Sequence, residues 1–243
     1  MDEEKRVIVT KQEKIVSMFD EIAPTYDKAN RVLSMGVDIV WRKKGCNQAF
    51  SYCSQEPLRI VDVACGTGDM MGYWQSVARD CGVAIEEIIG VDPSEGMVGV
   101  GREKFPNLTF FIAPATQLPR EDVSTDIISI SYGIRNVMER KEALLEFNRV
   151  LKPGGLVVIL EFMKNENPSV LGKVRDWYMG NVLPRLGGLI SNNYEAYKYL
   201  PDSIEGFLTV AKMQQELEES GFEMLYTKSF SMDISTLMIA RKK

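Results

Sequence analysis

Short, continuous apolar runs alternate with helix-like stretches through the middle of the chain. The first run is LRIVDVA at residues 58–64, and the glycine-containing segment CGTGD follows it directly. This is the profile of a strand that is buried on both faces and stopped by a turn. Four similar runs follow, at residues 86–92, 108–114, 125–131 and 155–162. Because helix-like stretches separate most of these runs, the pattern predicts parallel β-α-β units.

The N-terminal part of the chain has a different pattern. Residues 11–54 show no strand-like alternation, and apolar side chains recur there at helical spacing. These side chains are Ile15, Met18, Phe19 and Ile22. We expect helices in this region, the first of them ending at Pro24, because proline lacks the backbone N–H that a helix interior uses.

Two apolar runs close the chain, FEMLYTKSF at residues 222–230 and ISTLMIARK at residues 234–242. The segment SMD between them is too short for a crossover helix, so these runs predict an antiparallel hairpin. Upstream, LKPGG at residues 151–155 predicts a proline–glycine turn before the fifth strand. Five parallel strands followed by such a hairpin are typical of class I methyltransferases, whose α/β sheet is Rossmann-like and doubly wound.

Length and composition favour a single domain over residues 1–243, because this length with 45% hydrophobic side chains buries a sizeable core. Within the domain we expect N-terminal helices, a core that binds the methyl donor of such a methyltransferase, an inserted helical lid, and a C-terminal helix with the hairpin. Their expected ranges are 1–54, 55–162, 163–204 and 205–243, respectively.

Charge and the apolar runs also bear on partners and location. The net charge of −5 argues against a nucleic-acid binder, because phosphate contacts need a clustered Lys/Arg surface. The first residues are charged, and no apolar run reaches the roughly 18 residues of a membrane span. We therefore expect a cytoplasmic protein, or one that is peripheral to the inner face of the membrane.

The chain contains no histidine, which removes the Ser-His-Asp and Cys-His catalytic schemes and the commonest metal ligand. The four cysteines include no C-x-x-C pair, so neither a disulfide framework nor a zinc site is expected. No metal is expected. Any chemistry must therefore depend on carboxylates, tyrosines, arginines, water or an organic cofactor.

A glycine loop follows the first predicted strand. In VDVACGTGD, Gly66 and Gly68 let the backbone approach a ligand, and the next helix presents free N–H groups. A dinucleotide fingerprint needs a third glycine, but that position is Met71, which counts against a nicotinamide dehydrogenase. Asp62 and Asp69 would repel a pyrophosphate and suit the ammonium and sulfonium groups of S-adenosylmethionine. Taken alone, the loop would also fit an ordinary strand-to-helix turn.

The second predicted strand favours the methyl donor. Asp92 stands at its carboxyl end, where a carboxylate accepts both hydroxyls of an adenosine ribose. Met97 follows closely and is a candidate to pack on the adenine. Asp92 before Pro93 would by itself also fit a helix-capping turn. Its place one β-α-β unit after the glycine loop favours ribose binding.

The ends of the third and fourth strands add further candidates. Ala115 lies where this fold usually reaches the adenine edge. After the fourth strand, Ser131, Tyr132, Arg135 and Asn136 are expected at the same edge of the sheet, facing the methionine end of the donor or the acceptor. The sequence leaves open whether Arg135 is instead a structural ion-pair partner.

Several segments, taken together, carry a family resemblance. They are FDEIAPTYDKANRVLSMG at residues 19–36, the following Trp41-Arg42-Lys43, VDVACGTGD, SYGIRNV, RVLKPGG and YKYLPDSI. Their combination resembles the C-methyltransferase family of menaquinone and ubiquinone biosynthesis, which includes demethylmenaquinone methyltransferase. The resemblance covers nearly the whole chain. The Y-D-x-x-N and Y-G-I-R-N segments are its most particular parts.

The resemblance implies S-adenosylmethionine as the cofactor and a demethylmenaquinol or related quinol as the acceptor. It also implies donor contacts at five positions, which are Thr67, Asp92, Pro114, Ala115 and Ser131. The chain departs from the usual family pattern at Asp38-Ile39, where the family commonly has His-Arg, at Pro114, where it commonly has Asn or Asp, and at Met238, where a histidine is frequent. These departures bear on acceptor preference more than on donor binding.

Methylation at a ring carbon requires a quinol hydroxyl to lose its proton, because the phenolate makes the neighbouring carbon nucleophilic. Arg135 and Asn136 are the candidates near the acceptor, with Tyr26 and Asp27 as further catalytic candidates. The alternative role of Tyr26 and Asp27 is to hold the N-terminal helices over the cleft. Asp27, Asp38 or a water chain would each serve as the proton acceptor.

A prenylated quinol needs an apolar entrance, and its tail resides in a membrane. Residues 170–190 mix aliphatic, aromatic and basic side chains, which fits an interfacial lid and, equally, the core packing of an inserted helix. Two other functions remain open: methylation of another small acceptor, and S-adenosylmethionine binding without catalysis. The sequence leaves open whether the chain forms a homodimer.

Overall fold

The computed structural model describes residues 3–53, 57–166, 193–231 and 233–243, together with the single positions 178, 180, 181, 185 and 188. Its strands are β1 Leu58–Val63, β2 Ile85–Asp92, β3 Thr109–Ile112, β4 Thr125–Ser131, β5 Leu151–Glu161, β6 Phe222–Phe230 and β7 Ser235–Lys242. Its helices are α1 Glu3–Leu33, α2 Val37–Phe50, α3 Asp69–Cys81, α4 Glu95–Lys104, η1 Ile134–Asn136, α5 Arg140–Val150, α8 Tyr194–Glu205 and α9 Val210–Glu219.

The strands form one sheet with the order β3-β2-β1-β4-β5-β7-β6. Strands β1 to β5 pair in parallel, whereas β7 is antiparallel to both β5 and β6. Five parallel strands with a C-terminal antiparallel hairpin are therefore confirmed. Because β1 pairs with β2 on one side and β4 on the other, the strand order reverses between β1 and β4. In open sheets of this kind, ligands bind at the carboxyl ends of the strands beside such a reversal.

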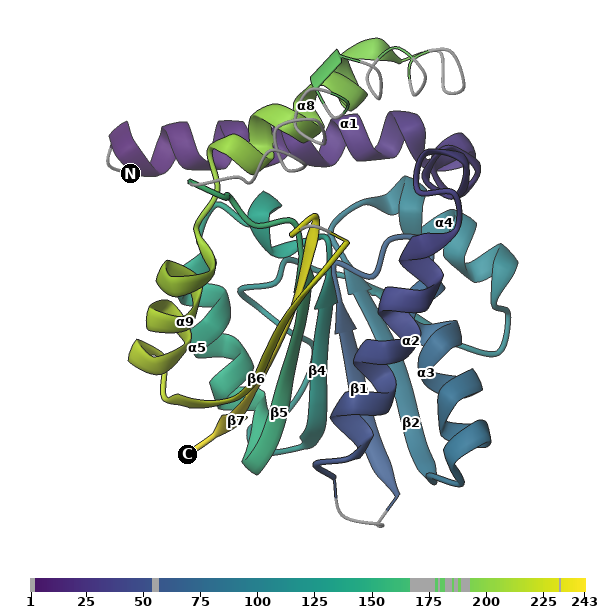
Figure 1. Ribbon diagram of the computed structural model, residues 1–243, viewed down its shortest axis with the longest axis vertical. Coiled ribbons are helices and arrows are strands. Elements are labelled where there is room, and N and C mark those ends of the chain that lie inside the picture. Colours follow the sequence, from purple (N-terminus) through teal and green to yellow (C-terminus); the bar gives the residue numbers. More distant parts are fainter. Residues whose placement is uncertain are drawn as a thin grey trace.

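Helices cover both faces of the sheet (Figure 1). Helices α5 and α9 lie on one face, and α2 and α3 lie on the other. The apolar runs of the central strands face both layers, which explains their continuity: Ile60, Val61 and Ile128 are all fully buried. Between the layers, Trp74 of α3 donates its indole N–H to Ser129 Oγ of β4 at 2.9 Å.

A third layer lies across the carboxyl ends of the parallel strands. Figure 1 shows α1 and α8 running side by side over this edge of the sheet. The helix α1 packs on α4 and α8 through a separate apolar cluster. Its buried members are Ile22, Ala23, Ala29, Met97, Ala196 and Tyr197. The N-terminal helices that the sequence predicts thus form the roof of the ligand-binding edge.

The prediction that the first helix ends at Pro24 is wrong, because α1 continues through Pro24 to Leu33. Pro24 removes one backbone hydrogen bond from the interior of this helix. Apolar residues on both sides of Pro24 are buried in the cluster with α4 and α8. This tertiary packing outweighs the local preference for a helix end.

The predicted turn at residues 151–155 is also corrected. Strand β5 already begins at Leu151, which pairs with Thr125, and regular pairing resumes at Leu156 with Ile127. Between them the register shifts, and Gly154 adopts a left-handed φ of 80°. The proline–glycine segment is therefore an irregularity inside the strand, because the chain on both sides of it stays paired with β4.

The predicted interfacial lid at residues 170–190 lies outside the described residues except for isolated positions. At the end of the predicted insertion, α8 is helical and packs on α1. Among the described residues, none of the helices combines the length and the apolar character that crossing a membrane requires.

Candidate active site

The turn after β1 brings three left-handed residues into a short loop. Ala64, Gly66 and Gly68 have φ angles of 49°, 54° and 84°. A side chain on Gly66 would meet no atom within 4 Å, whereas one on Gly68 would lie 2.8 Å from Phe110 Cζ. Gly66 therefore borders open space at the edge of the sheet, and Gly68 provides the close approach between this loop and β3.

Comparing Gly68→Ala with Gly82→Ala separates backbone strain from a steric clash. Both residues have left-handed φ angles, 84° and 69°, but a Cβ at Gly82 would meet nothing within 4 Å. The left-handed conformation costs alanine about 1 kcal/mol at either position. We expect urea unfolding to show a loss of about 1 kcal/mol for Gly82→Ala and about 2 kcal/mol for Gly68→Ala, since the second adds overpacking. Equal losses would contradict the role of the Phe110 contact.

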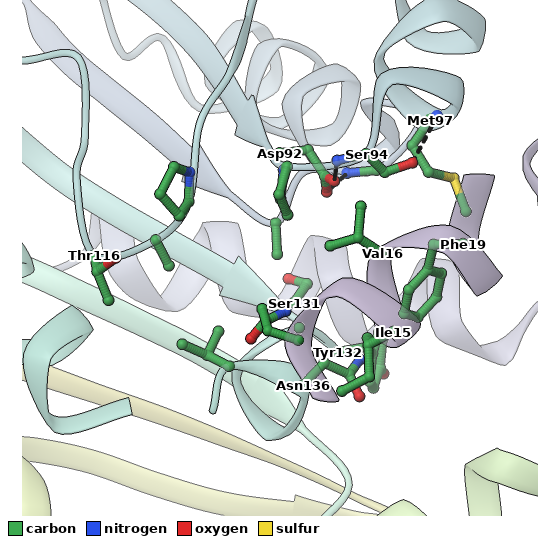
Figure 2. A pocket seen from close by; sticks show the side chains of 18 of the residues that line it. Ile15, Val16, Phe19, Asp92, Ser94, Met97, Thr116, Ser131, Tyr132 and Asn136 are labelled. Carbon is green, nitrogen blue, oxygen red and sulfur yellow. Dashed lines mark hydrogen bonds between the residues drawn. The ribbon is translucent and has the colours of Figure 1, made fainter. Parts of the chain in front are cut away.

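A cavity lies where the glycine loop, the ends of β2, β3 and β4, and α1 meet. Figure 2 shows Val16 of α1 between Asp92 and Ser131, with Ile15 and Phe19 beside it. The lining residues are Gln12, Ile15, Val16, Phe19, Tyr26, Ala64, Gly66, Asp92, Pro93, Ser94, Met97, Pro114, Ala115, Thr116, Ser131, Tyr132, Gly133, Asn136, Val137 and Glu139. The roof is thus mostly apolar, with Gln12 and Tyr26 as its polar members, while the floor carries the polar groups of the strand ends.

Asp92 is held in place by backbone donors. Its Oδ2 accepts from the Gly66 N–H at 2.8 Å, and its Oδ1 accepts from the Ser94 N–H at 2.9 Å. Burial raises the pKa of Asp92 to about 6, the two hydrogen bonds oppose this, and Asp20 of α1 adds to it. Each carboxylate oxygen keeps a lone pair for a ligand hydroxyl. The structure thus connects Asp92, the residue predicted to bind the ribose, to the glycine loop through a hydrogen bond.

Four more predicted residues line the cavity around Asp92. Met97 is buried in the first turn of α4, and Pro114 and Ala115 follow β3. At the end of β4, Ser131 Oγ is buried and has no hydrogen-bond partner within the described part of the chain. A buried hydroxyl without a partner is costly, so a polar ligand at this place would relieve that cost. These residues fit a ligand with an apolar ring and polar substituents.

Other predicted donor residues lie near the loop but do not line the cavity. Asp62 is fully buried in β1, where its Oδ1 accepts from Ser129 Oγ at 2.6 Å, and burial raises its pKa to about 7. Thr67 donates its hydroxyl to Asp27 Oδ1 at 2.6 Å. Gly68 caps α3. In this structure these residues support the glycine loop without facing the cavity.

Asp27 anchors α1 to the glycine loop. Besides Thr67, it accepts from Lys104 Nζ at 2.6 Å, and Lys104 also pairs with Asp69 at the start of α3. Arg31 of α1 reaches the other oxygen of Asp69 at 2.7 Å. This network agrees with the alternative that the sequence left open for Asp27, namely holding the N-terminal helix over the cleft.

Arg135 forms a buried ion pair instead of facing the cavity. Its NH1 donates to Glu161 Oε1 at 2.6 Å and to the Tyr132 carbonyl at 2.7 Å, and its Nε donates to Ser203 Oγ at 3.2 Å. The two charged side chains are 7% and 0% exposed. Of the two roles open from the sequence, the structure thus places Arg135 as an ion-pair partner.

Asn136 and Tyr26 do line the cavity. Asn136 Oδ1 accepts from the Tyr199 hydroxyl of α8 at 2.9 Å, which leaves its amide N–H groups for a ligand. Burial raises the pKa of the Tyr26 phenol, which Arg42 and a hydrogen bond with Asn30 oppose. Tyr26 therefore stays protonated near neutral pH. The predicted catalytic candidates thus divide into two that line the cavity and two, Asp27 and Arg135, that support it.

Sequence reasoning missed several lining residues. Gln12 and Val16 of α1 and Glu139 after η1 line the cavity without having been singled out. The only sequence signal was the helical spacing around Ile15 and Phe19, which indicates a buried face but not its partner. Among the described residues, no group of three or more Cys, Asp or Glu side chains is placed to hold a metal ion.

The sheet order, the glycine loop and the cavity at the strand ends define a class I methyltransferase fold. Two solved S-adenosylmethionine-dependent methyltransferases share it. The Thermotoga maritima structure has a TM-score of 0.60 and 19% identity, with 94% of this chain and 100% of that chain covered. The Aquifex aeolicus structure has a TM-score of 0.57 and 16% identity, with 82% and 89% covered.

The chain belongs to the ubiE/COQ5 methyltransferase family, whose model matches residues 7–242. The ubiquinone/menaquinone biosynthesis C-methyltransferase UbiE of Campylobacter jejuni serotype O:6 is 55% identical over 232 residues, 96% of this chain and 99% of that protein. The demethylmenaquinone methyltransferase of Chlorobaculum parvum is 37% identical over 241 residues, 98% and 97% of the two chains. The family resemblance, the fold class and the S-adenosylmethionine-dependent methyltransferase class predicted from the sequence are thereby confirmed.

Proposed function

We propose that this enzyme methylates a ring carbon of a prenylated quinol, converting demethylmenaquinol to menaquinol or acting on the related ubiquinol precursor. The observation that carries the proposal is the 55% identity over nearly full length to a relative named for this reaction. A second relative, named for demethylmenaquinone, supports the naphthoquinol as the first acceptor to test. The mostly apolar roof of the cavity fits a flat hydrophobic ring.

The donor site is proposed to follow the cavity floor. Asp92 would accept the ribose hydroxyls, Met97 and Ala115 would flank the adenine, and Ser131 Oγ would gain the partner that it lacks. When bound there, S-adenosylmethionine supplies a methyl group made electrophilic by its sulfonium. Thr67, which the family resemblance names as a donor contact, is proposed to contribute through the loop backbone, because its hydroxyl is bonded to Asp27.

The acceptor would sit between the roof and the end of β4. Asn136 and Tyr26 are the polar groups proposed to orient the quinol hydroxyl. The hydroxyl first gives up its proton, and the ring carbon takes the methyl group from the sulfonium. That carbon then loses its own proton while the oxygen regains one, so the reaction releases one proton in total. Asp38 is held by Arg31, whereas Glu139 is a lining residue of the cavity whose side chain has no hydrogen bond or ion pair among the described residues. We therefore assign proton transfer to Glu139, directly or through water.

Transfer of a labelled methyl group tests the proposal. We expect label on reduced demethylmenaquinone and none on the oxidised quinone, because only the quinol forms a phenolate. Glu139→Gln should slow transfer while leaving donor affinity unchanged. A benzoquinol lacking the ring methyl, run beside it, reports acceptor preference. If the protein binds S-adenosylmethionine but labels no quinol, then methylation of another small acceptor or donor binding without catalysis becomes the better function.

Donor affinity is expected to fall at acidic pH. The free carboxyl of Asp92 has a pKa raised to about 6, and only the ionised form accepts two ribose hydroxyls. Below that pH, donor binding must displace a proton. Calorimetry between pH 5 and 7 should therefore show about tenfold weaker binding at pH 5 than well above pH 6. A residual affinity of Asp92→Asn that does not vary with pH would support the assignment, and an unchanged pH dependence in that variant would reject it.

Peripheral membrane contact is proposed at the connection between α1 and α2. Four exposed apolar side chains gather there, Val32, Met35, Val37 and Val40, with Met35 at 83% exposure. Exposed Lys28 and Lys44 stand one helical turn from this group and suit an anionic surface. Met35→Asp is expected to reduce sedimentation with phosphatidylglycerol vesicles severalfold. Leu145→Asp, which changes an exposed leucine on α5, should have no effect. Equal behaviour of the two variants would refute this contact.

A further inference from the structure

Arg42 is a buried cation with unused hydrogen-bonding capacity. It lies in α2, and its side chain is only 11% exposed. Its nearest carboxylate is Asp38 at 3.6 Å, and its guanidinium lies 5.0 Å from the centre of the Tyr132 ring. Its Nε is buried without a hydrogen-bond partner among the described residues. A guanidinium has five N–H donors, so this one is poorly satisfied for a group so deeply buried.

The other cations around the glycine loop are already paired. Arg31 donates to both oxygens of Asp38, at 2.9 and 2.8 Å, and to Asp69 at 2.7 Å. Lys104 bridges Asp27 and Asp69, and Arg135 pairs with Glu161. Asp38 also accepts from Ser34 at 2.6 Å, so little of its capacity remains for Arg42. Among the described residues at this edge, Arg42 is therefore the guanidinium available to an anion.

Its position fits one end of the donor. Arg42 interacts electrostatically with Asp62 of β1, with Asp69 at the start of α3 and with Tyr26, and it stacks on Tyr132, which follows β4. It thus lies beside the reversal of strand order between β1 and β4. Asp92, proposed for the ribose, lies on β2 on the other side of β1. A ligand whose ribose lies at Asp92 and which extends across the glycine loop therefore has its other end on the side of β1 where Arg42 lies.

The far end of S-adenosylmethionine is an amino acid, whose ammonium and sulfonium groups suit the acidic side chains near the loop. Its carboxylate needs a cation. We propose that Arg42 binds the α-carboxylate of the donor. The planar guanidinium matches a carboxylate with two parallel N–H···O bonds, which lysine does not reproduce. The inference rests on the proposed donor site at Asp92, and it assigns a residue of the resemblance segment Trp41-Arg42-Lys43 to the donor.

Calorimetry with two donors tests this assignment. The second ligand is decarboxylated S-adenosylmethionine, which lacks only the carboxylate. The unchanged protein should bind the intact donor roughly 10- to 100-fold more tightly than the decarboxylated one, the range expected for charge-assisted hydrogen bonds. In Arg42→Met this ratio should shrink to about threefold or less, because only the intact donor loses a partner. Arg79→Met, at an exposed arginine of α3, should keep the full ratio.

Arg42→Lys keeps the charge but not the planar pair of N–H donors, so it should give an intermediate ratio. This variant replaces Arg42→Met in the experiment if the methionine variant does not fold. An unchanged ratio in both Arg42 variants would overturn the assignment. So would an unchanged ratio combined with slower methyl transfer at saturating donor, which would place Arg42 at the acceptor oxygen. The binding ratio is measured without a quinol, so a failure of the proposed quinol reaction leaves this ratio and its interpretation intact.

Discussion

Asp92→Ala is expected to weaken binding of S-adenosylmethionine about 100-fold, which is about 3 kcal/mol. Asp92 would accept two ribose hydroxyls, and hydrogen bonds to a charged group contribute about 1.5–3 kcal/mol each. The same carboxylate holds the Gly66 and Ser94 N–H groups, so the substitution also loosens the glycine loop and the start of α4. Isothermal titration of the donor measures the loss directly.

Two further variants frame this result. Asp92→Asn keeps the shape of the side chain but turns an amide N–H toward one of the two backbone donors, so its affinity should fall nearly as far. Asp80→Asn changes an exposed aspartate of α3 and should leave the affinity as it is. If Asp92→Ala bound the donor within about threefold of the unchanged protein, the ribose site would have to lie elsewhere.

Glu161→Gln is expected to lower the free energy of unfolding by about 3 kcal/mol. Glu161 is fully buried, and its partner Arg135 is nearly so. Neutralising one member of a buried ion pair leaves the other charge uncompensated in a poorly polar environment, which typically costs about 3–5 kcal/mol. Urea unfolding at neutral pH gives the measurement, because Cm and slope together report the change.

The matched control is Glu86→Gln, which removes one partner of the exposed pair with Arg59. Solvent screens that pair, so its loss should leave the free energy of unfolding unchanged within error. A second test combines Glu161→Gln with Arg135→Met. Because this removes the uncompensated charge, part of the lost stability should return. If the two glutamine variants lost similar free energies of unfolding, the burial of the pair between Arg135 and Glu161 would make no difference to its contribution to stability.

The sheet and part of the site could be predicted from the sequence. The apolar runs at 58–64 and 125–131 correspond to β1 and β4 almost residue for residue, because strands buried on both faces need continuous apolar side chains. Gly66 follows the first run, Asp92 and Ser131 each end a run, and the carboxyl ends of parallel strands meet at one edge. Their common cavity therefore follows from local pattern and topology alone.

The sequence placed other residues less well. Asp62 and Asp92 both belong to strands beside the glycine loop, yet Asp62 is turned into the core toward Ser129 while Asp92 borders the cavity. Arg135 looked equally suited to an acceptor and to an ion pair. Its partner Glu161 ends a different strand, so no local pattern connects the two residues.

By itself, the sequence determined the strands, their parallel direction, the glycine loop and the family, because each depends on residue types at short and regular spacing. Only the tertiary structure decided what covers the site and which charges remain available there. Helix α1 passes through Pro24 because α4 and α8 bury it on both sides of the proline. Arg42 stands apart from the other cations because carboxylates from distant segments have already paired with them. Such pairings depend on distances between elements, which periodicity along the chain does not encode.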